Sequence, residues 1–215
     1  ALDNINPADD GGWTPLHAAA KFGHLDIIKW YSHADRLRNP NPGIISNDEF
    51  NGHTPLHIAA GEGHRQIVKF LTGLLSDKNP GKSNGTTPMH LAAEKGQIDV
   101  VKKYAEVLNN PNSGTNYELD YALPHNGVTP MHDAAEHGHL DIVEFLTSIF
   151  TDKNPSDHIG KTPLHFAASC GHLDIVKLLA SNLTDKNPSD KDGITPLRSA
   201  AINGHLDILK FLASN

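Results

Sequence analysis

The stretch TPLHFAASCGHLDIVKLL, residues 162–179, returns in close copies along the chain. The copies begin at Thr14, Thr54, Thr87, Thr129, Thr162 and Thr195. Successive starts are 40, 33, 42, 33 and 33 residues apart, so three steps share one period and two exceed it. A period of this length is typical of repeat proteins, in which stacked copies of one unit bury a continuous core. We therefore expect one repeat domain.

Each copy predicts a pair of helices. Thr162 and Pro163 form a helix start, because the hydroxyl can cap free backbone N–H groups and proline suits the first turn. Gly171 predicts a left-handed end to this short helix. Apolar residues at helical spacing, such as Ile175 and Val176, predict a second helix, and a turn-rich link such as TDKNPSDKDG follows. One unit cannot bury its apolar faces alone, but six stacked units can.

The pattern resembles the ankyrin repeat family, in six copies in phase that cover nearly the whole chain. The resemblance implies an all-α solenoid, a curved stack of helix pairs with projecting hairpin-like loops. It also implies a module that binds a partner protein or peptide on its concave face. The chain departs from the family pattern where Gln97 and Arg198 replace a histidine, and where the links carry DKNP instead of GADVNA.

Residues 1–215 are expected to form a single domain with two longer loops, at about 32–48 and about 107–123. Pro, Asn and Gly are frequent in both, and an extended second helix is expected to precede them. The predicted repeats span about 9–41, 49–81, 82–114, 124–156, 157–189 and 190–215. Because residues 2–7 align with the tail of another repeat, we expect the chain to be a segment of a longer array.

A polar cluster, HDAAEHGHLD at residues 132–141, contains three histidines, two aspartates and one glutamate. Taken alone it suggests a metal site, because Asp133 and His137 are four residues apart on one helix. Its first and third histidines, however, fall at positions where most repeats carry histidine. A residue type that recurs in every unit is scaffold, whereas a catalytic site is normally built once. We predict a solvated polar helix surface at Asp133, Glu136 and His137, with no catalytic residue, metal or cofactor.

Ten of the 15 histidines occupy just two positions of the repeat. They are His17, His57, His90, His132 and His165 after the Pro-Leu or Pro-Met pair, and His24, His64, His139, His172 and His205 after the glycine. Buried polar groups must be satisfied, so hydrogen bonds between neighbouring loops and helix ends are the expected role.

The single cysteine, Cys170, cannot form an internal disulfide, which fits a reducing compartment; we expect an intracellular, cytoplasmic protein. Cys170 lies two residues from His172, but no orienting Asn or Asp is evident, so we interpret it as an ordinary thiol and expect no enzyme. The formal charge of −7 disfavours nucleic acid as a partner, and no apolar run is long enough for membrane insertion. We expect a monomer.

Asparagines precede proline at one position of the links, at Asn79, Asn154, Asn187 and the matching Asn6. An Asn before Pro is pushed toward extended backbone and can bond its own turn, which is our first interpretation. The family resemblance implies an alternative for the first three, hydroxylation by an asparaginyl hydroxylase of animal cells. Lys186 departs from the apolar residue that usually precedes the modified asparagine.

Binding is expected at positions that vary between copies, which in the family are the loop tips and the end of the first helix. The candidates are Trp13, Phe22, Phe50, His53, Glu62, Lys95, His125, Glu136, His137, His158, Ile159, Lys161 and Ile194. The four aromatic rings of copies one and two suit an interface anchor, although Trp13 could instead pack on its own loop. Copies five and six offer isoleucines with lysines beside them.

Two functions of different class follow from this reading. The first is a protein-interaction module that binds a partner along the concave face. The second is a structural spacer or targeting arm within a larger multidomain protein.

Overall fold

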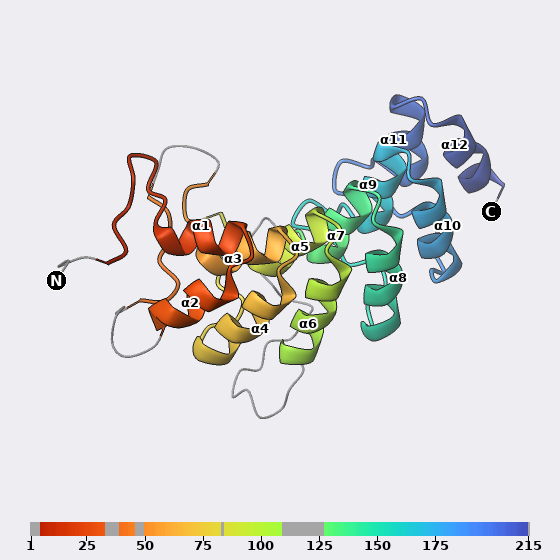
Figure 1. Cartoon of the computed structure of the whole chain (residues 1–215). Helices are drawn as coiled ribbons and strands as arrows, with labels where there is room; N and C mark the ends of the chain where they lie inside the picture. The colour runs from red at the N-terminus through yellow and green to blue at the C-terminus, as the bar shows by residue number, and fades with distance from the viewer. Residues whose placement is uncertain (1–4, 33–38, 46–49, 83, 109–126, 215) are drawn as a thin grey trace.

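Twelve helices follow one another in the part of the chain that the computed structural model describes, residues 5–32, 39–45, 50–82, 84–108 and 127–214. They form two rows, stacked in chain order with the two termini at opposite ends (Figure 1). The inner row contains α1 (Pro15–Lys21), α3 (Pro55–Gly61), α5 (Pro88–Glu94), α7 (Pro130–Glu136), α9 (Pro163–Cys170) and α11 (Pro196–Ile202). The outer row contains α2 (Leu25–Ser32), α4 (Arg65–Leu74), α6 (Ile98–Leu108), α8 (Leu140–Ile149), α10 (Leu173–Ser181) and α12 (Leu206–Ala213). The predicted all-α solenoid of helix pairs is confirmed, and no strand occurs within these ranges.

The ends of the inner helices follow the expected chemistry. Pro occupies the first turn of each, and the Thr54 hydroxyl accepts a hydrogen bond from the His57 N–H at 3.4 Å. Gly171 ends α9 with φ +86°, a left-handed conformation that glycine adopts at little cost. A Cβ there would also lie 2.6 Å from Cε1 of His205 in the next repeat. The glycine is therefore required by its backbone conformation and by a neighbouring side chain.

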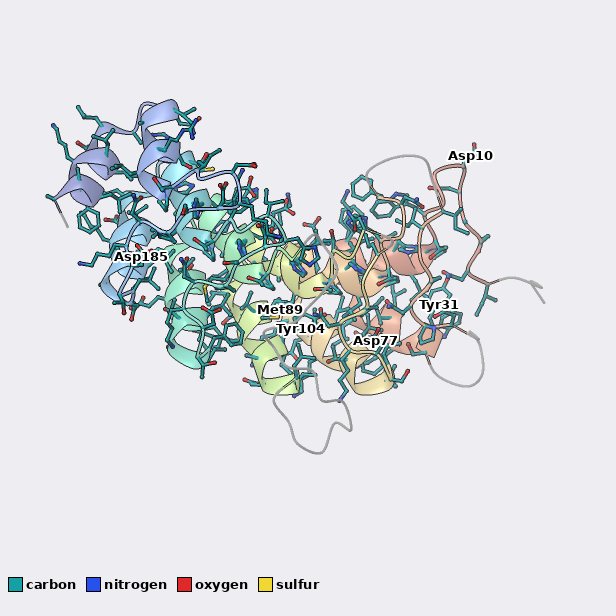
Figure 2. All side chains as sticks on the ribbon, turned by 180° about the vertical axis from the view of Figure 1, so that it is seen from behind. Asp10, Tyr31, Asp77, Met89, Tyr104 and Asp185 are labelled. Atoms are coloured by element: carbon teal, nitrogen blue, oxygen red, sulfur yellow. The ribbon has the colours of Figure 1, made fainter. Side chains whose placement is uncertain are left out.

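The apolar core runs between the two rows along the whole stack. Inner helices pack on the next inner helix, and each outer helix packs on its own inner partner. Alanines of the inner row, such as Ala20 and Ala60, are fully buried, so the inner helices approach closely. Larger side chains fill the space toward the outer row; Met89 of α5 and Tyr104 of α6 both belong to this core (Figure 2). Burial of these faces is the main source of cohesion.

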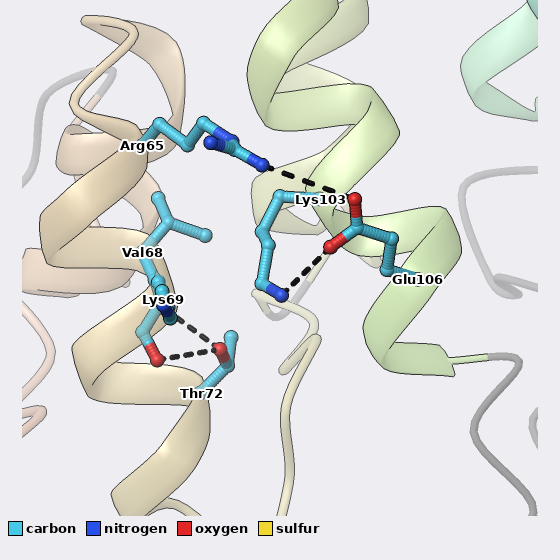
Figure 3. Close-up of polar contacts among 6 residues, drawn as sticks. All are labelled: Arg65, Val68, Lys69, Thr72, Lys103 and Glu106. Carbon is cyan, nitrogen blue, oxygen red and sulfur yellow. Dashed lines mark hydrogen bonds and ion pairs between the residues drawn. The ribbon is translucent and has the colours of Figure 1, made fainter.

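The ion pairs of the outer row lie on its exposed surface and contribute little to stability. Arg65 of α4 lies 3.8 Å from Glu106 of α6, and the same carboxylate pairs with Lys103 at 2.9 Å (Figure 3). Both Arg65 and Glu106 are about half exposed, and ion pairs in that setting contribute roughly 0–1 kcal/mol. The Thr72 hydroxyl in the same view donates within its own helix, to the carbonyls of Val68 at 2.8 Å and Lys69 at 3.3 Å.

The end of the first long loop, before the second repeat begins, makes ordered contacts with that repeat. Ile44 is buried, and its N–H donates to the carbonyl of His53 at 2.8 Å. The side-chain oxygen of Asn41 accepts from the N–H of Leu56 at 3.0 Å. The second long loop, from residue 109 onward, lies outside the described residues together with the candidate His125. The helix extensions expected before both loops stay predictions, because the residues after Ser32 and Leu108 are likewise not described.

Candidate binding surface

A frame of histidines links each repeat to the next. Nδ1 of His57 accepts from the backbone N–H of Thr54 at 3.3 Å, so the ring proton sits on Nε2, which donates to the carbonyl of Thr86 at 3.2 Å. Burial lowers the pKa of His57 to about 3 and that of His132 to about 4, so both rings are neutral. The same forward bond joins His17 to Pro42, His90 to Val128, His132 to Lys161 and His165 to Ile194.

The histidines after the glycine link each repeat to the previous one. Nε2 of His139 bonds the carbonyl of Glu94, at the end of the preceding inner helix, at 2.8 Å. The same backward bond joins His64 to Lys21, His172 to Glu136 and His205 to Ser169. Gln97 takes the place of histidine in the third repeat, and its side chain lies against Gly63 as the histidines lie against the equivalent glycines. The two histidine rows therefore brace the stack in both directions and leave the variable positions free to differ.

The link asparagines form a third structural row. The amide oxygen of Asn79 accepts from the N–H of Met89, in the first turn of the following inner helix, at 3.1 Å. The expected bond within its own turn is made instead by the backbone, where the Asn79 N–H donates to Asp77. Equivalent side-chain bonds join Asn6 to Leu16, Asn41 to Leu56, Asn154 to Leu164 and Asn187 to Leu197.

Asn41 was missed in the sequence because the long loop displaces it from the regular spacing. Its Asn-Pro pair is the signal that could have found it. Hydroxylation of Asn79, Asn154 and Asn187 stays a prediction. In the folded chain, these three amide oxygens are already engaged with helix N-termini.

Three of the four predicted aromatic residues meet at one cavity of about 270 Å³. The ring of Phe50 packs edge-on against Trp13, with 5.3 Å between centroids, and against His53 at 5.5 Å. Trp13 both packs on the core and lines the cavity, and its role as an interface anchor stays a prediction. His53 is only 7% exposed, and it therefore shapes the wall more than it presents a contact surface. The lining consists of Trp13, Lys21, Phe50, His53, His57, Ile58, Gly61, Glu62, Leu91 and Lys95.

Charged side chains border this aromatic cavity. The ammonium of Lys21 lies 5.4 Å from the centre of the Trp13 ring, within the range of a cation–π contact. Lys95 lies 2.8 Å from a carboxylate oxygen of Glu94. Phe22 was grouped with the other aromatics, but its ring contacts His24 instead and does not line the cavity. At 66% exposure it is an isolated apolar side chain on the surface.

The carboxy-terminal candidates are more dispersed. His158 and Ile159 are exposed on a loop tip, and the carbonyl of Ile159 accepts from the N–H of Lys191. Ile194 is partly buried, and its backbone carbonyl accepts a hydrogen bond from His165. Glu136 and Lys161 meet at a smaller cavity of about 140 Å³, lined by Glu136, Lys161, His165, Phe166, Ser169, Cys170 and Ser199. Phe166 was not among the predicted candidates, because a single apolar residue within a helix gives no sign of whether it faces a cavity or the core.

The polar cluster of residues 132–141 separates into its parts in the structure. Glu136 and His137 are exposed, as expected. Asp133 is not solvated in the same way: burial first, and then the charges of Glu94 and Glu136, raise the pKa of its carboxyl well above the usual value. The expectation is wrong at this residue because Asp133 is partly buried, at the position of the inner helix where other repeats place Ile, Leu or Phe. No group of three or more potential metal ligands occurs among the described residues.

The exposed thiol of Cys170 does not carry the signature of an activated nucleophile. Burial, and then the charge of Glu136, raise its pKa. The nearby His172 is occupied by its bond to the carbonyl of Glu136. A thiol with a raised pKa is a weaker nucleophile at neutral pH, because less of it is thiolate.

Comparison with known families identifies the repeat. Family models match residues 32–112 and 149–215 as ankyrin repeats (3 copies), residues 2–30 as ankyrin repeats (many copies) and residues 126–157 as an ankyrin repeat. The chain belongs to the ankyrin repeat family. Ankyrin repeats are generally non-catalytic modules of protein–protein interaction. No curated protein gives a significant match to this chain. None of the helices described is long and apolar enough to cross a membrane.

Proposed function

We propose that this ankyrin repeat domain binds a partner protein or peptide along the face formed by its inner helices and loop tips. The observation that carries the proposal is the aromatic cavity of Trp13, Phe50 and His53, defined above. Aromatic-lined pockets next to exposed charges are where interface anchors concentrate. The rigid histidine frame beneath it favours binding without a large ordering cost.

Comparison of equivalent positions in the repeats distinguishes those that hold the stack from those proposed to bind a partner. The inner-row positions that hold the stack carry His, Ala and Thr in most repeats. The cavity is lined by the frame histidine His57 together with positions whose residues change between repeats, such as Gly61 and Glu62. A position without a structural role can change to suit a partner with little loss of stability.

Gly61 offers a direct test of the proposal. It ends α3 and lines the cavity, and an added Cβ would meet only Cβ of Leu91, at an ordinary 3.7 Å. The variant Gly61→Leu should therefore fill the cavity without strain, since other repeats carry Lys, Glu, Ser or Ile at this position. Gly73→Leu, on the outer helix α4 with open space around its Cβ, is the matched control.

The experiment compares captured proteins between the wild-type chain and these two variants, by quantitative mass spectrometry of affinity pull-downs from isotopically labelled lysate. A partner that binds the proposed face is lost with Gly61→Leu and retained with Gly73→Leu, while both melting temperatures stay close to that of the wild type. If every captured protein ignores Gly61→Leu, the role of a spacer or targeting arm becomes the better explanation.

A further inference from the structure

One row of side chains along the inner helices changes character at Asp133. Ile58, Leu91 and Asp133 occupy the same position of α3, α5 and α7, and the first two line the aromatic cavity. These helices pack on one another in order, so Asp133 is the next side chain along the surface. This row is therefore apolar at Ile58 and Leu91 and carries a carboxylate at Asp133, one repeat further on.

Asp133 lies in a setting that suits a cation brought by a partner. It is partly buried, and no hydrogen bond or ion pair within the described residues reaches its carboxylate. Its charged neighbours are Glu94 and Glu136, and both raise the pKa of the Asp133 carboxyl, as burial does. Lys95, the residue that follows α5, is paired with Glu94 at 2.8 Å. A positive group placed here would be drawn to two carboxylates, those of Asp133 and Glu136.

We propose that the partner contributes an extended segment with two anchors, an apolar or aromatic side chain in the aromatic cavity and a lysine or arginine at Asp133 and Glu136. This inference rests on the proposed function and specifies its ligand. Adjacent packed helices lie about 8–10 Å apart and an extended chain rises about 3.3 Å per residue. The cavity spans α3 and α5, so the two anchors should be about three to five residues apart.

Charge complementarity favours this occupant over an acidic one. The chain carries a formal charge of −7, and a partner carboxylate placed here would be a fourth acidic group beside Asp133, Glu94 and Glu136. Like charges across an interface suppress wrong partners, whereas opposite charges guide encounter and fix register. The apolar anchor then supplies affinity and the cation supplies specificity.

The test is selection from a phage-displayed library of random dodecapeptides on three immobilised proteins: the wild-type chain, Gly61→Leu and Asp133→Leu. Leucine is the residue that α5 carries at the equivalent position, Leu91, so the variant preserves the inner row. Circular dichroism melts confirm that all three are folded. The best wild-type peptide is then resynthesised with its cation replaced by norleucine, and affinities are measured by fluorescence anisotropy.

Wild-type selection should enrich peptides that pair an apolar or aromatic residue with Lys or Arg at the stated spacing. Asp133→Leu should lose the basic preference. Norleucine and Asp133→Leu should each weaken binding about tenfold, with little further loss when combined, because they remove the same contact.

Peptides that Gly61→Leu blocks but that show no basic preference would overturn this inference and leave the proposed function standing. Peptides indifferent to both variants, or no enrichment at all, would overturn both.

Discussion

The two halves of the inner face stand on the same frame and carry different surfaces. In both halves, histidine after the Pro-Leu or Pro-Met pair bonds forward to the next loop; His57 bonds Thr86 and His165 bonds Ile194. Over α3 and α5 this frame carries an aromatic cavity of about 270 Å³, whereas over α7 and α9 it carries a smaller, more polar cavity of about 140 Å³. The same scaffold bonds therefore lie under cavities of different size and different lining.

Acid should weaken the frame of both halves at once. Burial lowers the pKa of His57 to about 3 and of His132 to about 4, so the unfolded chain takes up protons first as the pH falls through about 6.5. The stability these rings contribute is complete above that pH and is lost below it. Between about pH 8 and about pH 5 the two should cost about 4 kcal/mol together. The raised pKa of Asp133 acts in the opposite direction and offsets part of this loss.

Urea denaturation at both pH values measures the effect. A free energy of unfolding that stays constant or rises on acidification would contradict the neutral, buried state of these histidines.

Removal of one frame histidine should cost the same in either half. His57→Ala and His165→Ala each leave a threonine N–H and a loop carbonyl without their partner, so each should lower the free energy of unfolding by about 3 kcal/mol. Paired urea denaturation curves give the two values. A difference greater than about 1 kcal/mol would break the equivalence of the two halves.

Removal of a variable side chain should matter for binding mainly in the amino-terminal half. Trp13→Ala is expected to weaken a partner that binds the aromatic cavity by about 2 kcal/mol, roughly thirtyfold, whereas Lys161→Ala and Ile194→Ala should cost less than half of that. Trp13 also packs on the core, so titration calorimetry must be run well below the lowered melting temperature. Equal losses from all three variants would place the anchor elsewhere on the face.

The smallest expected effect lies at the boundary between the halves. Asp133→Asn should stabilise the fold by about 1 kcal/mol at neutral pH, because it removes a partly buried charge beside Glu94 and Glu136. The gain should vanish as the pH falls and Asp133 of the wild type takes up its proton. Thermal melts at neutral and acidic pH would show it, and a destabilised Asn variant would indicate that the carboxylate has a structural partner.

Part of the candidate site could be read from the sequence, and part could not. Trp13, Phe50 and His53 were predicted together because their loops occupy equivalent places in consecutive repeats. Phe22 was placed with them because the end of the first helix is the other variable position, yet its ring contacts His24 and does not line the cavity. Leu91 was overlooked, because a single apolar residue within a helix gives no sign of whether it faces a cavity or the core.

The sequence alone determined the architecture. Its period, its Thr-Pro helix starts and its glycines repeat in phase, and such local rules act within a few residues of the chain. Only the tertiary structure decided the partners of the frame and the character of the surface. Nε2 of His139 reaches a carbonyl 45 residues away, and the amide of Asn41 reaches Leu56 across an irregular loop. The raised pKa of Asp133 likewise depends first on burial in the stack and then on the charges of Glu94 and Glu136, from two repeats. Contacts of that range are set by how the units stack, because stacking brings together residues that no local pattern relates.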